Sequence, residues 1–306
     1  MPFPLSNGMP NISGVFIPTI WAGKLIEKLY DYCVIPQISN TDYEGSISDK
    51  GDKVIIRTVP TVTIRNYDAG QALQVERPDS PTVTLNIDQG RYFNMILDDV
   101  MKIQSDLNLM DQWASDAAMQ MKINIDRYVL AATVVDAAIP AANKGIAAGR
   151  LSGNLNLGTT GAAVQINKTT VVEKILDMGL VLDEQNIPDP GRFLVLPPAA
   201  IRLIKASDLK DASVSGDGTS ILRNGRVGMI DRFEIYSSNL MPRPADTNNP
   251  QWGLAGTKMG LTFATQITKV ESLRAESTFG NLMRGLNVFG TKVVKGEALT
   301  PLYFYI

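Results

Sequence analysis

The sequence of 306 residues contains no histidine and only one cysteine, Cys33. Without histidine, the chain lacks the usual general base near neutral pH, the imidazole metal ligand, and the Ser-His-Asp and Cys-His arrangements that activate nucleophiles. A single cysteine can form neither an intrachain disulfide nor a zinc-thiolate site. Catalysis would have to rest on carboxylates, lysine, tyrosine or a cofactor. We therefore expect a protein that is not an enzyme and that holds no cofactor and no metal.

Long apolar runs and a strongly basic composition are missing as well. The most apolar run, Tyr128–Val135, is 8 residues long and ends at Asp136, whereas a membrane span needs about 20 residues. The N-terminus has no basic segment followed by an apolar one, as a secretory signal would. Lys and Arg number 29 against 31 Asp and Glu, which gives a net charge of −2. We expect no membrane partner and no tight hold on the phosphates of nucleic acid.

The chain is long enough for two domain-sized units of about 150 residues each. Met1–Asn11 is rich in Pro, Gly, Ser and Asn, which is typical of an extended arm. From Pro18 onward, apolar residues at helical spacing predict a short amphipathic helix that ends near Cys33. A small buried side chain is the simpler interpretation of Cys33, and a reactive thiol is the alternative.

A β-rich excursion occupies much of the first hundred residues. Lys53–Val59, Thr61–Tyr67, Thr82–Ile87 and Arg91–Leu97 are rich in β-branched and aromatic residues, which predicts four strands. Between the second and third, Asp68–Ser80 has turn-forming and polar residues and no long apolar run. Such an excursion has little core of its own, so we expect it to pack on something else, such as another subunit.

Helical periodicity begins after the excursion. From Leu107 onward, apolar residues form one stripe at a spacing of 3.6 that ends with Tyr128, Ala132 and Val135. This stripe predicts a helix roughly 40 Å long. The second half of the sequence alternates helical and strand-like patterns. The predicted elements are a helix over 168–187, a buried strand within Arg192–Pro198, a helix from Pro198, a loop over Val214–Ser220, two short strands around a turn near Asp231, a polar loop over Pro242–Pro250, and a mostly strand-like tail over Trp252–Ile306.

Five charged residues lie in the β-rich excursion. They are Arg57, Arg65, Asp68, Glu76 and Arg77. One interpretation is an ordinary solvated surface. The other is the charged rim of a subunit contact, where charge sets the register of the two partners more than their affinity. The sequence leaves both interpretations open.

An adjacent pair of carboxylates, Asp98 and Asp99, follows the last of these strands. A metal site would need a third oxygen ligand, and neither Asp88 nor Asp106 gives a recognised spacing. The favoured interpretation is structural, because aspartate at a helix start satisfies free backbone N–H groups. Ser105 or Asp106 is a second capping candidate, for the long helix itself. A carboxylate-dependent enzyme that uses the adjacent pair is the alternative from another functional class.

The order of these segments resembles the major capsid (coat) proteins of tailed bacteriophages. The matching pieces are "IPTIWAGKLIEKL", "DYEGSISDKGDKVII", "IDQGRYFNMILDDVMKIQSDL", "RFLVLPP", "LRNGRVGMIDRFEIYSSNLMP" and "KVESLRAESTFGNLMRGLNVFGTKVV". No single piece is a catalytic motif, and the resemblance lies in their order and spacing along nearly the whole chain.

The resemblance implies an α+β fold with five parts. They are an N-terminal arm and short helix (1–43), an extended β-hairpin loop that lies over a neighbouring subunit (44–97), a peripheral domain with a long spine helix (98–139), an axial domain (140–262), and a return to the peripheral-domain sheet (263–306), with the last strand rejoining the axial domain as a variant of this scheme.

The implied function is self-assembly into hexamers and pentamers that close into an icosahedral shell around double-stranded DNA. The implied partners are further copies of the chain, a scaffolding protein and a portal during assembly in the host bacterial cytoplasm, and packaged DNA without sequence-specific contacts. Some members of this family join subunits through a loop lysine, but Asp68–Ser80 contains none, so we expect no covalent cross-link. An encapsulin-like cellular shell that stores a cargo enzyme would share the fold and is the nearest alternative.

Overall fold

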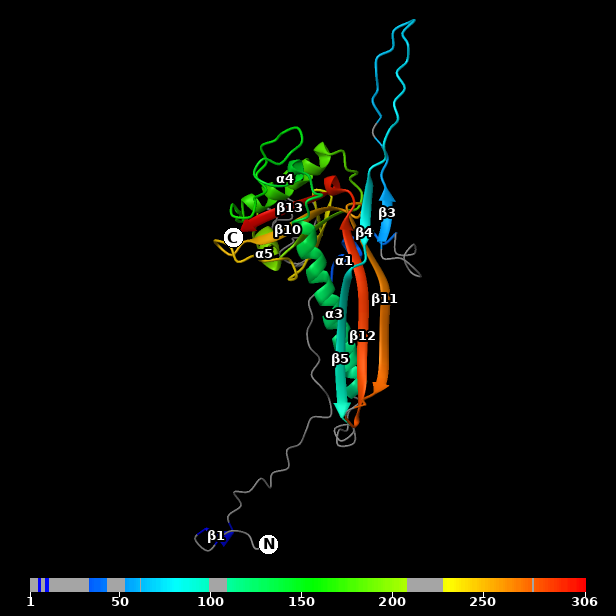
Figure 1. Cartoon of the computed structure of the whole chain (residues 1–306). Helices are drawn as coiled ribbons and strands as arrows, with labels where there is room; N and C mark the ends of the chain where they lie inside the picture. Colours follow the sequence, from blue (N-terminus) through cyan, green and yellow to red (C-terminus); the bar gives the residue numbers. More distant parts are fainter. Residues whose placement is uncertain are drawn as a thin grey trace.

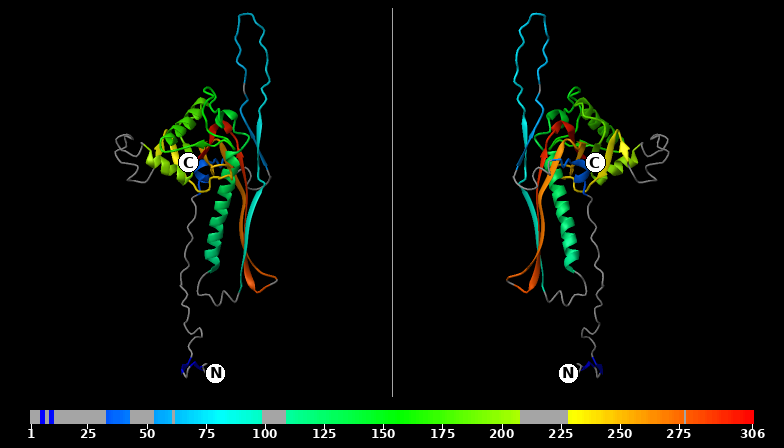
Figure 2. Two further views of the ribbon diagram at one scale, coloured as in Figure 1. Left: turned by 90° about the vertical axis from the view of Figure 1, so that its left-hand side faces the viewer. Right: turned by 90° about the vertical axis from the view of Figure 1, so that its right-hand side faces the viewer.

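The computed structural model has two bodies and a projecting hairpin (Figure 1). One body is built around a six-stranded sheet, and in the other a long helix, α3 (Leu109–Val134), lies along a three-stranded sheet. Two views at right angles to the first show the hairpin extending beyond both bodies (Figure 2). The structure describes residues 5–6, 9–10, 33–42, 53–60, 62–98, 109–207, 228–276 and 278–306.

The six-stranded sheet is mixed. Its strands, in order across the sheet, are β6 (Val164–Gln165), β13 (Leu299–Tyr305), β10 (Gln251–Thr257), β7 (Arg192–Leu196), β9 (Phe233–Ser237) and β8 (Met229–Ile230). The pairs β6–β13 and β7–β9 are parallel, and the other pairs are antiparallel. The central strands β7, β10 and β13 are buried along nearly their whole length, as their near-continuous apolar sequences require.

Helices cover both faces of this sheet. On one face, α4 (Thr170–Glu184) and α5 (Pro198–Ala206) pack on Leu194, Leu196 and Phe304 in one apolar core. The alternate side chains point to the other face and join a second core. There they meet the short helix α1 (Ile35–Ile38) and the C-terminal half of α3.

The elongated body is an antiparallel sheet in the order β11 (Leu261–Arg274), β12 (Gly280–Val293) and β5 (Gln89–Asp98). One face packs on α3: the ring of Phe289 meets Tyr128 edge-on at 5.9 Å, and Arg91 lies 5.1 Å from the Tyr128 ring. Arg91 also donates a 3.0 Å hydrogen bond to Asn124 of α3. These contacts fix the helix along the sheet.

The projecting hairpin starts from a two-stranded ribbon of β3 (Lys53–Arg57) and β4 (Thr82–Asn86). The ribbon packs on the other face of the three-stranded sheet, through a small apolar core that includes Ile56, Leu85 and Ala264. The remaining short elements are β1 (Leu5–Ser6), β2 (Met9–Pro10), and two 3₁₀ helices, η2 (Ala141–Asn143) and η4 (Gly296–Ala298).

Most of the predicted elements are present. The long helix, the helices over 168–187 and from Pro198, the buried strand from Arg192 and the turn at Asp231 are confirmed. The predicted strand Thr61–Tyr67 is wrong: residues 62–67 are extended but belong to no strand. The hairpin has prolines on both of its arms, Pro60 on one and Pro78 and Pro81 on the other. Because proline has no N–H to donate, these residues interrupt the β-ladder between the arms.

Four further predictions either fall outside the described residues or differ from the structure in detail. The helix predicted from Pro18 and the loop Val214–Ser220 lie outside the described residues, apart from the last few residues of the helix. Cys33, expected to be buried, is half-buried. The last strand, β13, belongs to the six-stranded sheet and not to the three-stranded one. Within the described residues, no helix is both long and apolar enough to cross a membrane.

Candidate subunit-contact surface

The base of the projecting loop is closed by side-chain hydrogen bonds. The backbone N–H and the hydroxyl of Thr58 donate to the carbonyl oxygen of Pro81 at 3.0 and 2.7 Å. The Ser80 hydroxyl donates back to the Thr58 carbonyl at 2.5 Å. These bonds hold the two arms together where proline ends the β-ladder. The loop, defined here as residues 58–81, therefore leaves the ribbon in a fixed direction.

Side chains also hold the middle of the loop. Glu76 accepts hydrogen bonds from the backbone N–H and the hydroxyl of Thr63 at 3.3 and 3.2 Å. Two residues closer to the tip, Arg65 donates to the side-chain carbonyl of Gln74. Such cross-arm bonds replace the backbone ladder that the prolines interrupt.

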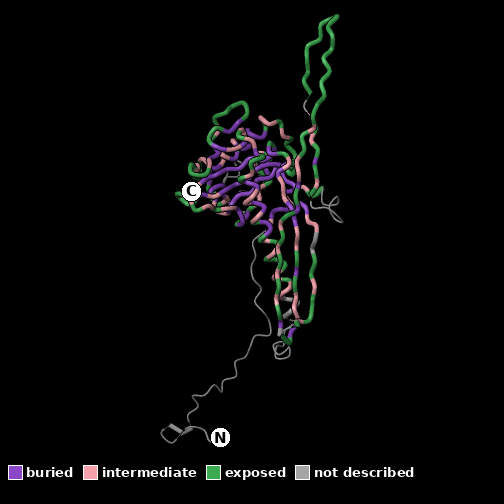
Figure 3. The backbone as a smooth tube through the Cα atoms, viewed as in Figure 1, coloured by how far each residue is buried: buried purple, intermediate pink, exposed green. Residues whose placement is uncertain are grey.

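Large apolar side chains of the loop are exposed to a degree unusual for a folded chain. The loop is exposed along nearly its whole length (Figure 3). The exposed fractions are Val59 92%, Val62 54%, Ile64 90%, Tyr67 69%, Leu73 77% and Val75 95%. Several large apolar side chains exposed together on one loop mark an interaction site.

The five charged residues predicted for a subunit contact all lie on this hairpin and are exposed. Arg57 is at the end of β3, Arg65 and Glu76 make the cross-arm bonds, and Asp68 begins the turn at the tip, where its carbonyl accepts the N–H of Gln71 at 3.0 Å. Arg77 follows Glu76 on the returning arm. Their part in a subunit contact stays a prediction.

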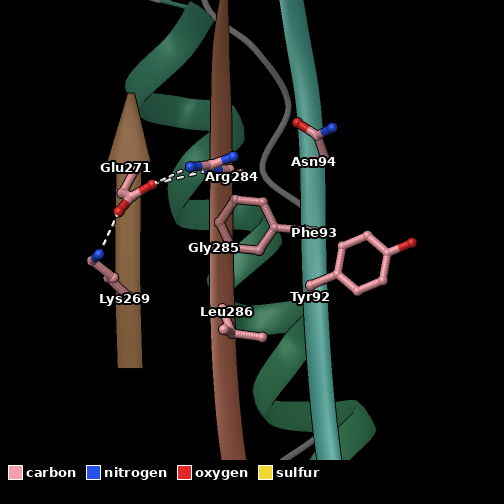
Figure 4. A pocket seen from close by; sticks show the side chains of 8 residues that line it. All are labelled: Tyr92, Phe93, Asn94, Lys269, Glu271, Arg284, Gly285 and Leu286. Atoms are coloured by element: carbon pink, nitrogen blue, oxygen red, sulfur yellow. Dashed lines mark hydrogen bonds and ion pairs between the residues drawn. The ribbon is translucent and has the colours of Figure 1, made fainter. Parts of the chain in front are cut away.

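A second surface lies on the three-stranded sheet, on the face opposite α3. A groove of about 410 Å³ opens there (Figure 4). It is lined by Tyr92, Phe93 and Asn94 of β5, Lys269 and Glu271 of β11, and Arg284, Gly285 and Leu286 of β12. The β3–β4 ribbon covers one end of this face, and Tyr92, Ile96, Leu273 and Leu286 remain exposed on the rest of it.

An ion-pair network crosses the groove. Glu271 accepts contacts at 2.6 Å from Lys269 and at 2.6 and 2.9 Å from Arg284 on the adjacent strand. Lys269 and then Arg284 lower the pKa of the Glu271 carboxyl. With two cations and one anion, the groove has a net positive charge beside an apolar stripe.

The four predicted helix-capping residues are described only in part. Asp98 ends β5, where it pairs with Gly280, while Asp99, Ser105 and Asp106 lie outside the described residues. Their capping roles stay predictions. Across the residues that the structure does describe, no group of three Asp, Glu, Cys or His side chains is arranged to hold a metal ion.

The sequence interpretation missed two buried charged residues, Arg192 and Asp126. Arg192, whose side chain is fully buried, donates to Asp183 at 2.7 Å, and Arg232 bonds the same carboxyl at 2.8 Å. On α3, the buried Asp126 accepts the backbone N–H groups of Val34 and Ile35. The sequence feature that could have predicted them is a charged residue in an otherwise apolar segment. For Arg192 this segment is β7, and for Asp126 it is the apolar stripe of the long helix.

Comparison with known proteins agrees with this architecture. A family model described as phage capsid protein matches residues 81–300, which is more than half of the chain. The chain belongs to the phage capsid protein family. A chain of Mycobacterium phage Che8 is similar at 25% identity, with a TM-score of 0.78 over 94% of this chain and 97% of that one.

Two more distant capsid structures share the fold. The capsid of Cyanophage P-SCSP1u matches at 16% identity and a TM-score of 0.72, over 98% of this chain and 96% of that one. The capsid of a native GTA particle matches at 13% identity and a TM-score of 0.67, over 99% and 100%. No curated protein matches the chain. The α+β fold and the resemblance to major capsid proteins of tailed bacteriophages are confirmed, and the family implies a structural role.

Proposed function

We propose that this capsid protein assembles into hexamers and pentamers, which close into an icosahedral shell around double-stranded DNA. The observation that supports this most strongly is the loop over residues 58–81. Its apolar side chains are up to 95% exposed, and no core within the described chain reaches them. A loop of this kind gains its apolar burial only from another copy.

The open part of the three-stranded sheet is a suitable receiver for the loop of a neighbouring copy. Its apolar stripe of Tyr92, Ile96 and Leu286 suits the apolar loop side chains, and the groove has a positive balance. The loop arms between residues 62 and 79 carry Arg65, Arg77, Asp68, Glu76 and Asp79, a net charge of −1. Because loop and groove are different surfaces, the contact is heterologous, and it generates a ring when the rotation from copy to copy closes.

The domain scheme follows from this arrangement as part of the proposal. The six-stranded sheet with α4 and α5 corresponds to the axial domain that meets its copies around the five-fold or six-fold axis. The three-stranded sheet with α3 corresponds to the peripheral domain. Since β13 lies in the six-stranded sheet, we assign residues 299–305 to the axial domain, and not to the peripheral return that was expected over 263–306.

Partners other than the chain itself belong to the same proposal. The net charge of −2 suits a container that encloses DNA without sequence-specific contacts. We infer that a scaffolding protein and a portal act with the chain during assembly in the host bacterial cytoplasm, and that the finished protein resides in the virion.

The test is assembly of the full chain, expressed with its candidate scaffold genes and imaged by electron microscopy. Wild-type chains should form closed shells. A loop variant, Ile64→Asp with Val75→Asp, and a groove variant, Tyr92→Asp with Leu286→Asp, should each form none. Mixed together, each loop-defective chain still offers a good groove, and each groove-defective chain a good loop. The mixture should therefore form dimers that neither variant forms alone.

Two results would overturn the proposal. A wild-type chain that stays monomeric at high concentration under all such conditions would exclude the shell. Closed shells from the loop variant would exclude this loop as the contact. Thermal unfolding of the unassembled variants is the control, because substitutions of exposed residues should leave each melting temperature close to that of the wild type.

A further inference from the structure

Residues 33–42 form a short segment, here called the strap, between α3 and the start of β11. At its first end, the Asp126 carboxylate on α3 accepts the N–H of Val34 at 2.6 Å and that of Ile35 at 3.4 Å. The Cys33 thiol bonds the same carboxylate. Asp126 is 5% exposed and Val34 is fully buried, so water cannot replace the carboxylate as the acceptor of the Val34 N–H.

At its second end, the strap pairs with β11. The N–H of Asn40 donates to the Leu261 carbonyl at 2.8 Å, and the N–H of Phe263 donates to the Asn40 carbonyl at 2.9 Å. Asn40 and Thr262 form a parallel bridge there. The strap is therefore attached to two different elements, one at each end.

Between these ends, the strap fills the junction of the two bodies. Val34, Ile35 and Ile38 are buried in the core that also contains side chains of the six-stranded sheet, of α3 and of β12. The only helical turn in the strap is α1, which is four residues long and ends at Ile38. A segment with so few internal bonds gets its order from what it is attached to.

We propose that the strap can detach from α3 and β11 while the rest of the chain stays folded, and that Asp126 is the positioning residue that holds it in place. Opening the strap undocks residues 33–42 and leaves the strands and long helices folded. The bonds broken include the two N–H contacts and the Cys33 thiol contact to Asp126 and the two backbone bonds to β11, and the burial of three apolar side chains is lost with them. No strand of either sheet has to separate.

A strap that can detach and redock would be useful in a shell. A chain that serves in both five-fold and six-fold rings meets its neighbours at two different angles. A junction segment that can redock lets one sequence fit both settings, whereas two sheets joined by a rigid core cannot adjust. This use rests on the proposed function, but the opening itself is a property of the unassembled chain.

The chain carries its own reporter for the opening. Cys33 is the single cysteine of the sequence and lies at the first end of the strap. A maleimide probe applied to the purified, unassembled full-length chain therefore labels one site. We expect Asp126→Ala to raise the labelling rate about tenfold or more, because it leaves the buried Val34 N–H without an acceptor and favours the open state. Since the substitution also removes the partner of the Cys33 thiol, hydrogen exchange of residues 34–42 in the same variant must rise as well, and a rise in labelling without it would overturn the proposal.

Two matched variants separate release from general weakening. Thr133→Ala removes another buried polar side chain from α3, one that bonds the Val129 carbonyl at 2.8 Å and not the strap. Asp116→Ala removes a carboxylate from the same helix, 10 residues before Asp126. Both should label at the wild-type rate. An unchanged rate in Asp126→Ala, or an equal rise in Thr133→Ala, would overturn the proposal.

Hydrogen exchange on the wild-type chain gives a second test that needs no variant. Peptides covering residues 33–42 should take up deuterium in one step, faster than peptides of the C-terminal half of α3 and of β7. Exchange of the strap only together with those core elements would show that it opens only by global unfolding. Failure of shell assembly would leave both measurements intact, so the two proposals fail independently.

Discussion

Glu76 spans the projecting loop and accepts two hydrogen bonds from Thr63, one from the backbone N–H and one from the hydroxyl. A carboxylate thus ties together two arms that have lost their β-ladder to proline. Both residues are exposed, so the tie contributes little to the stability of the folded chain, about 1 kcal/mol or less per bond. Its effect is to keep the two apolar edges of the loop in one conformation before a partner arrives.

We therefore predict that Glu76→Ala lowers the yield of closed shells several-fold while the melting temperature of the unassembled chain stays nearly unchanged. The loop arms separate more often, and a neighbour must order them at an entropic cost. Sedimentation and thermal unfolding measure the two quantities. Glu173→Ala, which removes an exposed carboxylate from α4, is the control and should assemble normally. A wild-type yield from Glu76→Ala would contradict the prediction.

Gly290 sets the distance between the hairpin ribbon and the three-stranded sheet. A Cβ atom on this residue would clash with the carbonyl oxygen of Asn86 and crowd the Cα atom of Ile87, both of them backbone. We predict that Gly290→Ala costs about 1–3 kcal/mol of unfolding free energy, since the ribbon must shift. Urea unfolding measures this cost.

Gly90 provides the matched control for this substitution. It lies in β5, opposite Val288 of β12, and a Cβ atom there would meet nothing within 4 Å. Gly90→Ala should be neutral or slightly stabilising, because alanine reduces the freedom of the unfolded chain. Equal costs for the two substitutions would show that the close approach at Gly290 is not what matters.

The sequence predicted most of the regular elements because their patterns reflect local constraints. Arg192–Leu196 reads as a buried strand from its apolar run, and proline at position 198 marks the start of α5. The loop arms were harder. Thr61–Tyr67 has strand-forming side chains, but whether a ladder forms depends on the opposite arm, where Pro78 and Pro81 lie.

The periodicity of α3 located the helix but placed its buried face about one residue off. The predicted stripe ended at Tyr128, Ala132 and Val135, whereas the structure buries Val129, Leu130 and Val134 and leaves Val135 61% exposed. Two sheets and the strap contact this end of the helix, so the buried face depends on tertiary packing and not on one apolar stripe. The same packing explains why Asp126 is buried.

The Arg192–Asp183 pair predicts an asymmetry between its two partners. The side chain of Arg192 is fully buried, while that of Asp183 is 38% exposed and is also bonded by Arg232. Burial raises the pKa of the Asp183 carboxyl, but the hydrogen bonds from Arg232 and Arg192 outweigh it and leave this pKa lowered. The buried guanidinium is therefore the group that depends on its partner.

We predict that Asp183→Ala destabilises the chain by about 2 kcal/mol, less than the 3–5 expected for a fully buried pair, because Asp189 still lies 3.1 Å from Arg192. Arg192→Met should cost less, since it removes the buried charge and leaves Asp183 paired with Arg232. Urea unfolding followed by tryptophan fluorescence compares the two. A larger loss from Arg192→Met would contradict this account.

The strap predicts a pH dependence whose sign follows from the carboxyl of Asp126. Burial raises the pKa of this carboxyl, and the N–H groups of Val34 and Ile35 and the Cys33 thiol only partly offset it. When the strap opens, water reaches the carboxyl and its pKa returns toward the ordinary 3.8. The docked state thus binds the proton more tightly than the open state.

By linkage, strap docking is strongest below the ordinary pKa of aspartate and weakens as the pH rises through the raised value. We predict that the free energy of local opening falls across that window and is constant above it. Hydrogen exchange of residues 33–42 at a series of pH values, corrected for the intrinsic exchange rate, measures this. Asp126→Asn has no proton to lose and should show a flat profile. A wild-type opening free energy that rises with pH would mean that the carboxylate gains more from its N–H donors than it loses by burial.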